Sequence, residues 1–506
     1  MKLSEQSISK NTILTILQSV IRVIFPLLTY PYVARMLHPE GLGRASFAAS
    51  IAAYFVLFAQ LGMPVYGLRT CGKLQSDTNR LYDTAAELML IDFLCGVAVS
   101  LCYLITIISV PLFRADCLLY LIYGLQIFFI SFNCDWFYRA MGKYSFLTAM
   151  MTACRMIAAI ALFLFVKDNQ AVYSYALISV FVTVGVSLYS FLWLHHFPEF
   201  NPVRRILDKM TQNGIQSAFR RHIKPVLTFF VMSCTVSVYS HIDTTMLGII
   251  KDSQTVGLYS LAARVRFALT MLSGAVASVS MPVASGMWNT GDMYRFQKLT
   301  LRSFHIVTEM SLPLSIFFIL FAKPCVRVLG GADFLMATVP LRVLLLAVFP
   351  IGISNVFGTQ MLIPTGHERI LLKAELLGLF CNLLGNAVLI PRYAAAGASA
   401  ATVLSETVVS IAAGIYVKRI LKEQYDKLHC LFSVFFKSVA GCALAGLISW
   451  LLRVHFINDG SFLQSFGSIA AEGCIFGSIY VIWMLLTKDP LYRTLLKSIL
   501  KSCAKH

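Results

Sequence analysis

Charged residues are scarce in this chain of 506 residues, where Asp, Glu, Lys and Arg together make up only 13%. A soluble domain would carry about 25%. Hydrophobic residues make up 58% of the chain, and apolar runs of about 20 residues, each long enough to cross a bilayer as a helix, recur from end to end. The short alternating segments of a transmembrane β-barrel are absent. The composition therefore predicts an all-α, polytopic membrane protein.

Cysteine pairs at metal-binding or redox spacing are also lacking. None of the thirteen cysteines belongs to a C-x-x-C pair, most lie inside apolar runs, and the ten histidines are dispersed. We therefore expect small buried thiols, no metal site and no cofactor. Paired hydrolytic carboxylates, a nucleophile elbow and a phosphate-binding glycine loop are missing as well, so the chain is not expected to be an enzyme.

The apolar runs predict about fourteen transmembrane helices. No cleavable signal peptide is expected, because the first run is too long and no cleavage site follows it. The loops on one side hold 28 Lys and Arg residues and those on the other side 9, which predicts that both termini are cytoplasmic. Most of the net charge of +18 then faces an anionic leaflet, so nucleic-acid binding is not expected. The expected spans are 11–35, 43–66, 86–112, 117–137, 144–166, 171–195, 223–250, 256–284, 300–322, 335–362, 369–390, 394–417, 434–455 and 466–487.

A weak internal repeat predicts the domain organisation. The seven residues 43–49, which follow the first span, match residues 257–263, which follow the seventh, at four positions. The repeat predicts two six-helix lobes around a central cavity and two extra C-terminal helices; chance similarity between apolar helices is the alternative. The expected parts are an N-terminal lobe at 1–195, a cytoplasmic linker at 196–222, a C-terminal lobe at 223–420, and spans 13 and 14 with a basic cytoplasmic tail at 421–506.

Basic residues inside the apolar runs are the main functional signal. An arginine at mid-bilayer costs roughly 2.5–3.5 kcal/mol on insertion scales, so it is expected to face protein or water. Arg22 and Arg155 each lie roughly 16 Å from the cytoplasmic end of their helix. Arg264 and Arg266 point to nearly opposite faces of one helix, and we favour Arg264 because it shares a face with Ser260.

Polar side chains recur at helical spacing within several spans, as Gln18 and Arg22 do in the first. We expect them to line a cationic cavity that binds an anion such as a phosphate or a carboxylate. Hydrogen bonds or salt bridges between helices are the alternative role. The residues expected in the cavity are Gln18, Arg22, Arg155, Arg264 and Asn382.

Carboxylates inside the spans have two candidate roles. Asp243, Glu309 and Glu406 either form salt bridges with arginine or bind a coupling proton or sodium ion. The sequence does not separate these roles. For Glu87 and Asp92, near the cytoplasmic end of the third span, exposure to solvent is the simplest interpretation.

Four stretches resemble the polysaccharide transporter family of Wzx-like oligosaccharide flippases, within the multidrug/oligosaccharidyl-lipid/polysaccharide superfamily. They are LLTYPYVARMLHPEGLGRASFAAS at 27–50, DWFYRAMGKYSFLT at 135–148, HIDTTMLGIIKDSQTVGLYSLAARV at 241–265 and IPTGHERILLKAELLG at 363–378. The most specific pieces contain Asp135 and Trp136 in one case and Gly257 and Tyr259 in the other. The resemblance runs in order over essentially the first twelve spans.

The resemblance implies a flippase that carries an undecaprenyl-pyrophosphate-linked oligosaccharide to the outer leaflet of a bacterial plasma (inner) membrane. The product would feed synthesis of capsule, O-antigen or a teichoic-acid-like polymer. Membrane lipids, a coupling proton or sodium ion, and the polysaccharide polymerase and export machinery are the implied partners. Two alternatives stay open: a peptidoglycan-precursor flippase, and a multidrug antiporter for small cations, whose cavity would be dominated by acids. A membrane-embedded polymerase or ligase would carry a larger outer loop.

Overall fold

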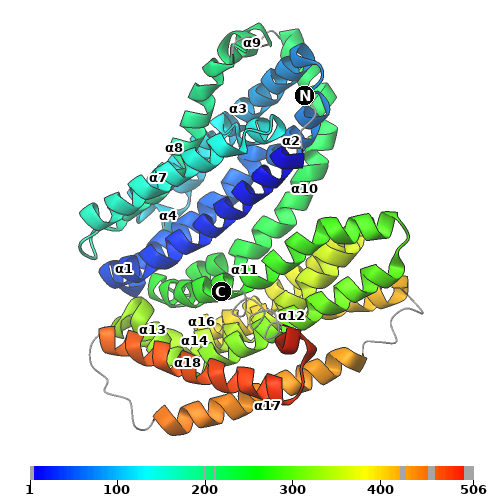
Figure 1. Ribbon diagram of the computed structural model, residues 1–506. Helices are drawn as coiled ribbons and strands as arrows, with labels where there is room; N and C mark the ends of the chain where they lie inside the picture. The colour runs from blue at the N-terminus through cyan, green and yellow to red at the C-terminus, as the bar shows by residue number, and fades with distance from the viewer. Residues whose placement is uncertain (1–4, 198–199, 210–211, 422–428, 454–461, 495–506) are drawn as a thin grey trace, which may run out of the picture. The chain divides into compact units, whose positions relative to one another are not determined.

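The computed structural model describes residues 5–494 except 198–199, 210–211, 422–428 and 454–461. The side chains of residues 5–27 and of a few other positions also lie outside the description. The described residues form α-helices and short 3₁₀ or π segments, and no strand (Figure 1). The expected all-α fold is confirmed.

The chain divides into two compact units, Met1–Thr245 and Met246–His506. The boundary lies inside a helix, α10, which begins within the first unit. The division into lobes, linker and C-terminal appendix stays a prediction. The elements that begin in the first unit are α1 (Glu5–Gln60), α2 (Met63–Lys73), α3 (Thr78–Ser109), α4 (Pro111–Arg114), α5 (Cys117–Phe129), η1 (Ile130–Phe132), α6 (Asp135–Ala140), α7 (Tyr144–Phe165), α8 (Val172–Leu192), η2 (Trp193–His196), α9 (Pro202–Lys209) and α10 (Gln212–Ile250).

The second unit is helical in the same way, and its last two helices pack on the helices before them. Helix α17 contacts α12 and α18, and α18 also contacts α13. The elements are α11 (Ser253–Asn289), α12 (Met293–Leu320), α13 (Ala322–Gly330), η3 (Ala332–Ala337), α14 (Thr338–Leu345), α15 (Val348–Asn355), η4 (Val356–Leu362), α16 (Glu368–Leu421), α17 (His429–Arg453) and α18 (Phe462–Leu486).

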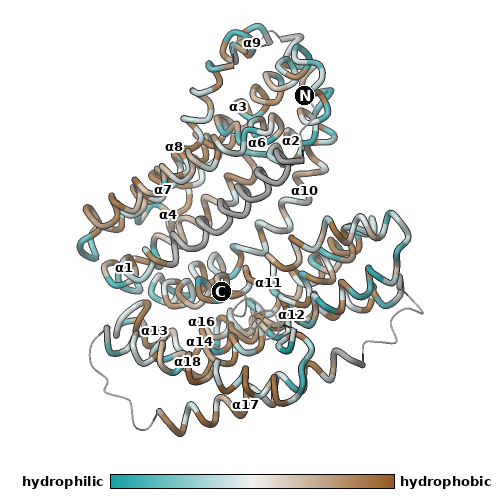
Figure 2. The backbone as a smooth tube through the Cα atoms, in the orientation of Figure 1, coloured by the Kyte–Doolittle hydropathy of each residue, from teal (hydrophilic) through white to brown (hydrophobic). Residues whose placement is uncertain are grey.

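Eleven helical stretches in the described part of the chain are long and apolar enough to cross a membrane, and a bent pair within α10 raises the number to twelve. Two long helices are each broken once, α1 at His38 with φ 56° and α16 at Ala394 with φ 48°. Hydrophobic residues follow the lengths of α7 and α8, whereas hydrophilic residues gather in α9 (Figure 2). These observations confirm a multi-pass membrane protein, and the number of fourteen spans stays a prediction.

Aspartates begin three of the long helices. The side chains of Asp77, Asp252 and Asp292 each accept a hydrogen bond from the backbone N–H three residues later, at 3.1, 2.7 and 3.1 Å. An N-terminal N–H has no carbonyl partner within its helix, so an aspartate at this position both pairs it and favours the positive end of the helix dipole. These caps fix where α3, α11 and α12 begin.

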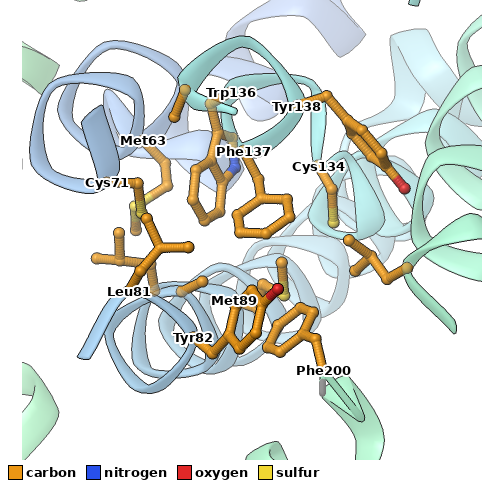
Figure 3. Close-up of a cluster of buried hydrophobic side chains, with 14 of the residues drawn as sticks. Met63, Cys71, Leu81, Tyr82, Met89, Cys134, Trp136, Phe137, Tyr138 and Phe200 are labelled. Carbon is orange, nitrogen blue, oxygen red and sulfur yellow. The ribbon is translucent and has the colours of Figure 1, made fainter. Parts of the chain in front are cut away.

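An aromatic cluster holds the short helix α6 against α2 and α3 in the first unit (Figure 3). Trp136 and Phe137 are buried there, and Phe137 stacks on Phe200 with ring centroids 5.5 Å apart. Gly67 of α2 lies beneath the Trp136 indole, since a Cβ atom at Gly67 would lie 2.6 Å from that ring. The close approach of α2 and α6 therefore requires glycine at this position.

We predict that Gly67→Ala destabilises the first unit by about 1–3 kcal/mol, because the methyl group overlaps the buried indole. Thermal unfolding of the detergent-purified protein measures the effect as a lower Tm. Gly72→Ala is the matched control on the same helix, since no atom lies within 4 Å of a Cβ placed there. The control is expected to keep or slightly raise the Tm, because alanine favours a helix over glycine. Equal Tm values for the two variants would contradict the packing role of Gly67.

Candidate functional site

The candidate site begins with the basic residues inside the membrane helices. Arg155 is half-buried in α7 of the first unit, and Arg264 is exposed on α11 of the second, whereas Arg266 is half-buried. The choice of Arg264 over Arg266 stays a prediction, because exposure alone does not tell a cavity from lipid. The side chains of Gln18 and Arg22 lie outside the described residues. A shared cationic cavity therefore stays a prediction.

A buried carboxylate network joins α3 to α10 in the first unit. Glu87 is 3% exposed and accepts hydrogen bonds from Arg221 Nη1 at 3.0 Å and from His222 Nε2 at 3.1 Å. The other ring nitrogen of His222 lies 2.8 Å from the Tyr66 hydroxyl. An imidazole protonated at Nε2 donates to Glu87. Glu87 thus joins α3 to α10, and His222 joins α10 to α2.

A second network lies beyond the opposite end of α3. Arg44 in α1 contacts Asp116 at 2.7 Å, with its Nε donating to the same carboxylate at 2.8 Å. Tyr173 in α8 donates to the other oxygen of Asp116 at 3.0 Å. One carboxylate therefore joins α1, the start of α5 and α8. Arg44 belongs to one of the stretches on which the family resemblance rests, and its side chain here has a structural partner.

The two halves of α16 form a close-packed pair, and the first half carries two hydrogen-bonded amides. A Cβ atom at Gly385 would lie 3.0 Å from the Cβ of Ala401, so the halves approach closely on either side of the break at Ala394. Asn382 is 1% exposed and accepts a hydrogen bond from Asn386 at 3.0 Å. Asn382 is thus placed inside the packing of the second unit, in contact with a neighbouring amide.

The helix that carries the Gly257 motif also contributes to the polar interior of the second unit. Tyr259 is 2% exposed, and its hydroxyl lies 3.4 Å from the Thr402 hydroxyl of α16. Gly257 is buried one turn from the start of α11. Tyr259 therefore lies where α11 meets α16.

The three candidate acids are all buried, at 7% exposed for Asp243, 5% for Glu309 and 7% for Glu406. Glu309 accepts hydrogen bonds from the Ser438 hydroxyl at 2.9 Å and from the Tyr480 hydroxyl at 2.5 Å. Hydroxyls from α17 and α18 thus both donate to Glu309. The salt-bridge and ion-coupling roles of the three acids stay predictions.

The aromatic motif at 135–138 lies in the core of the first unit. Asp135 pairs with Arg139 one turn later at 3.0 Å, and the Tyr138 hydroxyl donates to the Ser190 carbonyl at 2.7 Å. Trp136 fills the space beneath α2 (Figure 3). The motif residues thus join α6 to α2 and α8, which is a packing role.

Solvent exposure of Glu87 and Asp92, the simplest interpretation of the sequence, is wrong. Both side chains are buried, at 3% and 4% exposed. The basic residues of the expected linker could have indicated that these acids are paired, since Arg221 pairs with Glu87 and Arg205 pairs with Asp83 at 2.7 Å. Cytoplasmic basic residues were interpreted only as a topology signal, although some of them neutralise acids on α3.

Comparison with known families supplies what the geometry does not. The model of a family described as polysaccharide biosynthesis protein matches residues 8–288, more than half of the chain. The chain belongs to this polysaccharide biosynthesis family. A second model, MatE, matches residues 229–388, as expected for the wider multidrug/oligosaccharidyl-lipid/polysaccharide superfamily. Family and relatives are transporters or flippases, and this member is not an enzyme.

Individual relatives share little sequence identity with this family member, but the alignments cover large parts of the chain. A candidate O-antigen transporter of Escherichia coli K12 is 20% identical over 386 residues, covering 75% of this chain and 90% of the relative. A candidate low-salt glycan biosynthesis flippase of Haloferax volcanii is 24% identical over 267 residues, covering 52% and 53%. The solved lipid II flippase MurJ, in an inward closed conformation, shares the fold with a TM-score of 0.69 at 16% identity, covering 96% of this chain and 99% of that one.

We predict that the two members of the Glu87–Arg221 pair contribute unequally to stability. Replacing Glu87 by Ala removes hydrogen bonds to a charged group and leaves a buried imidazole without its acceptor, which costs about 1.5–3 kcal/mol. Replacing Arg221 by Ala costs less than about 1 kcal/mol, because its side chain is 63% exposed and solvent screens the pair. Thermal unfolding of both variants in detergent measures the difference. A larger loss for Arg221→Ala would contradict the burial argument.

Proposed function

We propose that this polysaccharide biosynthesis family member is a flippase for an undecaprenyl-pyrophosphate-linked oligosaccharide. It translocates the repeat unit from the cytoplasmic to the outer leaflet of a bacterial plasma membrane by alternating access. The flipped unit feeds the synthesis of a cell-surface polysaccharide such as capsule, O-antigen or a teichoic-acid-like polymer. Both termini face the cytoplasm in this proposal.

The observation that carries the proposal is the family match over residues 8–288 in a chain built of membrane helices. The relatives from E. coli and H. volcanii are named for O-antigen transport and for glycan flipping. Their names support a glycan as the cargo. The fold shared with MurJ covers nearly the whole chain, which supports a transporter architecture with the two C-terminal helices included.

The chemistry of arginine supports an anionic cargo. A guanidinium offers donors in a planar fork that matches a phosphate oxygen pair, and it stays protonated in membrane surroundings. Arg155 occupies the middle of α7 and Arg264 lies in the apolar first half of α11. In our proposal these side chains, with Arg22, bind the pyrophosphate while the isoprenoid tail stays in lipid. Asp243, Glu309 and Glu406 are the candidate sites for a coupling proton or sodium ion.

A peptidoglycan-precursor flippase is the second candidate function. The MurJ fold covers 96% of this chain, whereas an inward-facing multidrug transporter of the MATE family covers 80% with a TM-score of 0.60. Both are 16% identical to this chain, so these likenesses concern the fold alone. The two functions share a lipid-linked pyrophosphate and differ in the attached sugars.

We predict that Arg155→Ala and Arg264→Ala lower polysaccharide export about 10- to 100-fold, because each removes a charged hydrogen bond to the cargo. The measurement is surface polymer in a strain that lacks the chromosomal copy, with equal membrane levels of each variant. Arg266→Ala is the matched control, since it removes a guanidinium from the opposite face of the same helix. Arg155→Lys and Arg264→Lys keep the positive charge but remove the planar fork, so they separate bidentate binding from charge alone. Full export by both alanine variants would overturn the arginine role.

Depletion of the wild-type protein separates the candidate functions. The proposed flippase predicts that lipid-linked oligosaccharide accumulates on the inner leaflet while peptidoglycan synthesis continues. A peptidoglycan-precursor flippase predicts accumulation of the lipid-linked muropeptide and cell lysis instead. Increased sensitivity to cationic drugs with normal polymer would favour the multidrug alternative.

A further inference from the structure

One cluster of metal-ligating side chains lies apart from the residues assigned to the cargo. His305 and Glu309 are four residues apart on α12, so they share a face of that helix. Asp489 follows the end of α18 and lies 2.9 Å from His305 through its Oδ2 and the imidazole Nε2. One ligand atom from each of the three residues lies within 4.8 Å of the others.

The cluster is buried and short of positive charge. The side chains of His305 and Asp489 are 13% and 1% exposed, and Glu309 is 5% exposed. Among the ion pairs of the described residues, His305 is the basic partner of Asp489, and the hydrogen-bond donors to Glu309 are hydroxyls. With both carboxylates ionised, one imidazole does not give the cluster a positive balance, and unbalanced negative charge in a low-dielectric region is unfavourable without a cation.

The surrounding groups hold the three side chains as ligands. Ser438 and Tyr480 each donate to one oxygen of Glu309, and the Leu491 N–H donates to Asp489 Oδ1 at 2.9 Å. Each carboxylate oxygen has a second lone pair that these bonds leave available. Hydrogen bonds of this kind orient the ligands of metal sites in proteins.

The distances are close to those of a metal site. Metal–ligand bonds of about 2.1 Å in a tetrahedron place the ligand atoms about 3.4 Å apart. The His305–Asp489 separation of 2.9 Å is already within this distance. The Glu309 ligand atom lies no more than 4.8 Å from the other two.

We propose that His305, Glu309 and Asp489 form a binding site for a divalent transition-metal cation, with one imidazole and two carboxylate ligands. This donor set suits Zn²⁺ and Mn²⁺ better than a hard cation such as Mg²⁺, because an imidazole nitrogen is among the ligands. The bound cation connects α12 to the segment that follows α18. It thereby fixes the C-terminal helix pair to the rest of the second unit, independently of which cargo the protein carries.

Apolar packing already brings these helices together around the site. Phe317 and Phe321 at the end of α12 pack with Cys442 of α17 and with Phe476 and Met484 of α18. The cation therefore joins elements that are in contact without it. Its removal is expected to loosen this contact and leave the fold in place.

The test is metal binding by the full-length protein in detergent, stripped with EDTA and titrated with Zn²⁺ alone. Calorimetry and elemental analysis are expected to show one tightly held Zn²⁺ per chain. The Tm is expected to rise with Zn²⁺ concentration, since a ligand that binds only the folded state stabilises it. A parallel titration with Mn²⁺ ranks the two cations.

His305→Gln and Glu309→Gln are expected to weaken Zn²⁺ binding at least about tenfold and to abolish the Zn²⁺-dependent rise in Tm, because each removes one ligand of three. His367→Gln is the matched control, since it removes a histidine of the same unit outside the cluster. Wild-type protein that binds no Zn²⁺, or binds it as weakly as the two ligand variants do, would overturn the proposal. The wild-type titration decides the matter even if a ligand variant fails to fold.

Discussion

The structure depends on one constraint: a polar group inside an apolar helix bundle needs a partner within the protein, because hydrocarbon offers none. Two of the buried carboxylates have such partners from helices distant in sequence. Glu87 pairs with His222 across 135 positions, and Glu309 accepts from Tyr480 across 171. Apolar packing alone discriminates poorly between a neighbouring helix and lipid, so these paired groups specify which helices meet.

Close packing supplies the second source of specificity, and it uses small residues. Gly67 admits the indole of Trp136, and Gly385 admits Ala401 across the two halves of α16. In both places a side chain on the glycine would force the backbones apart. Dispersion forces fall steeply with separation, so contact at this range is worth more than apolar contact with mobile lipid. The packed glycines and the paired carboxylates thus together determine which helices meet.

The helices could be predicted from the sequence because length and apolar composition decide them locally. The break at His38 also has a local cause, since Pro39 follows it and disfavours the helical conformation of the preceding residue. The sequence contains no such local signal for the partners of buried charges. His222 and Glu87 meet only because α3 and α10 pack together, and no periodicity along either helix indicates this pairing. The family resemblance likewise identified Trp136 as a motif residue but did not indicate its role, which is burial beneath α2.

The positions of the ion pairs bear on the interpretation of Arg155. Among the described side chains of the first unit, Arg44 pairs with Asp116 beyond one end of α3, and Arg205 and Arg221 pair with acids near its other end. Charges near helix ends lie close to water and polar headgroups, where holding them is least unfavourable. Arg155 lies instead halfway along α7, between apolar turns on either side. The cargo role proposed for Arg155 rests on this depth.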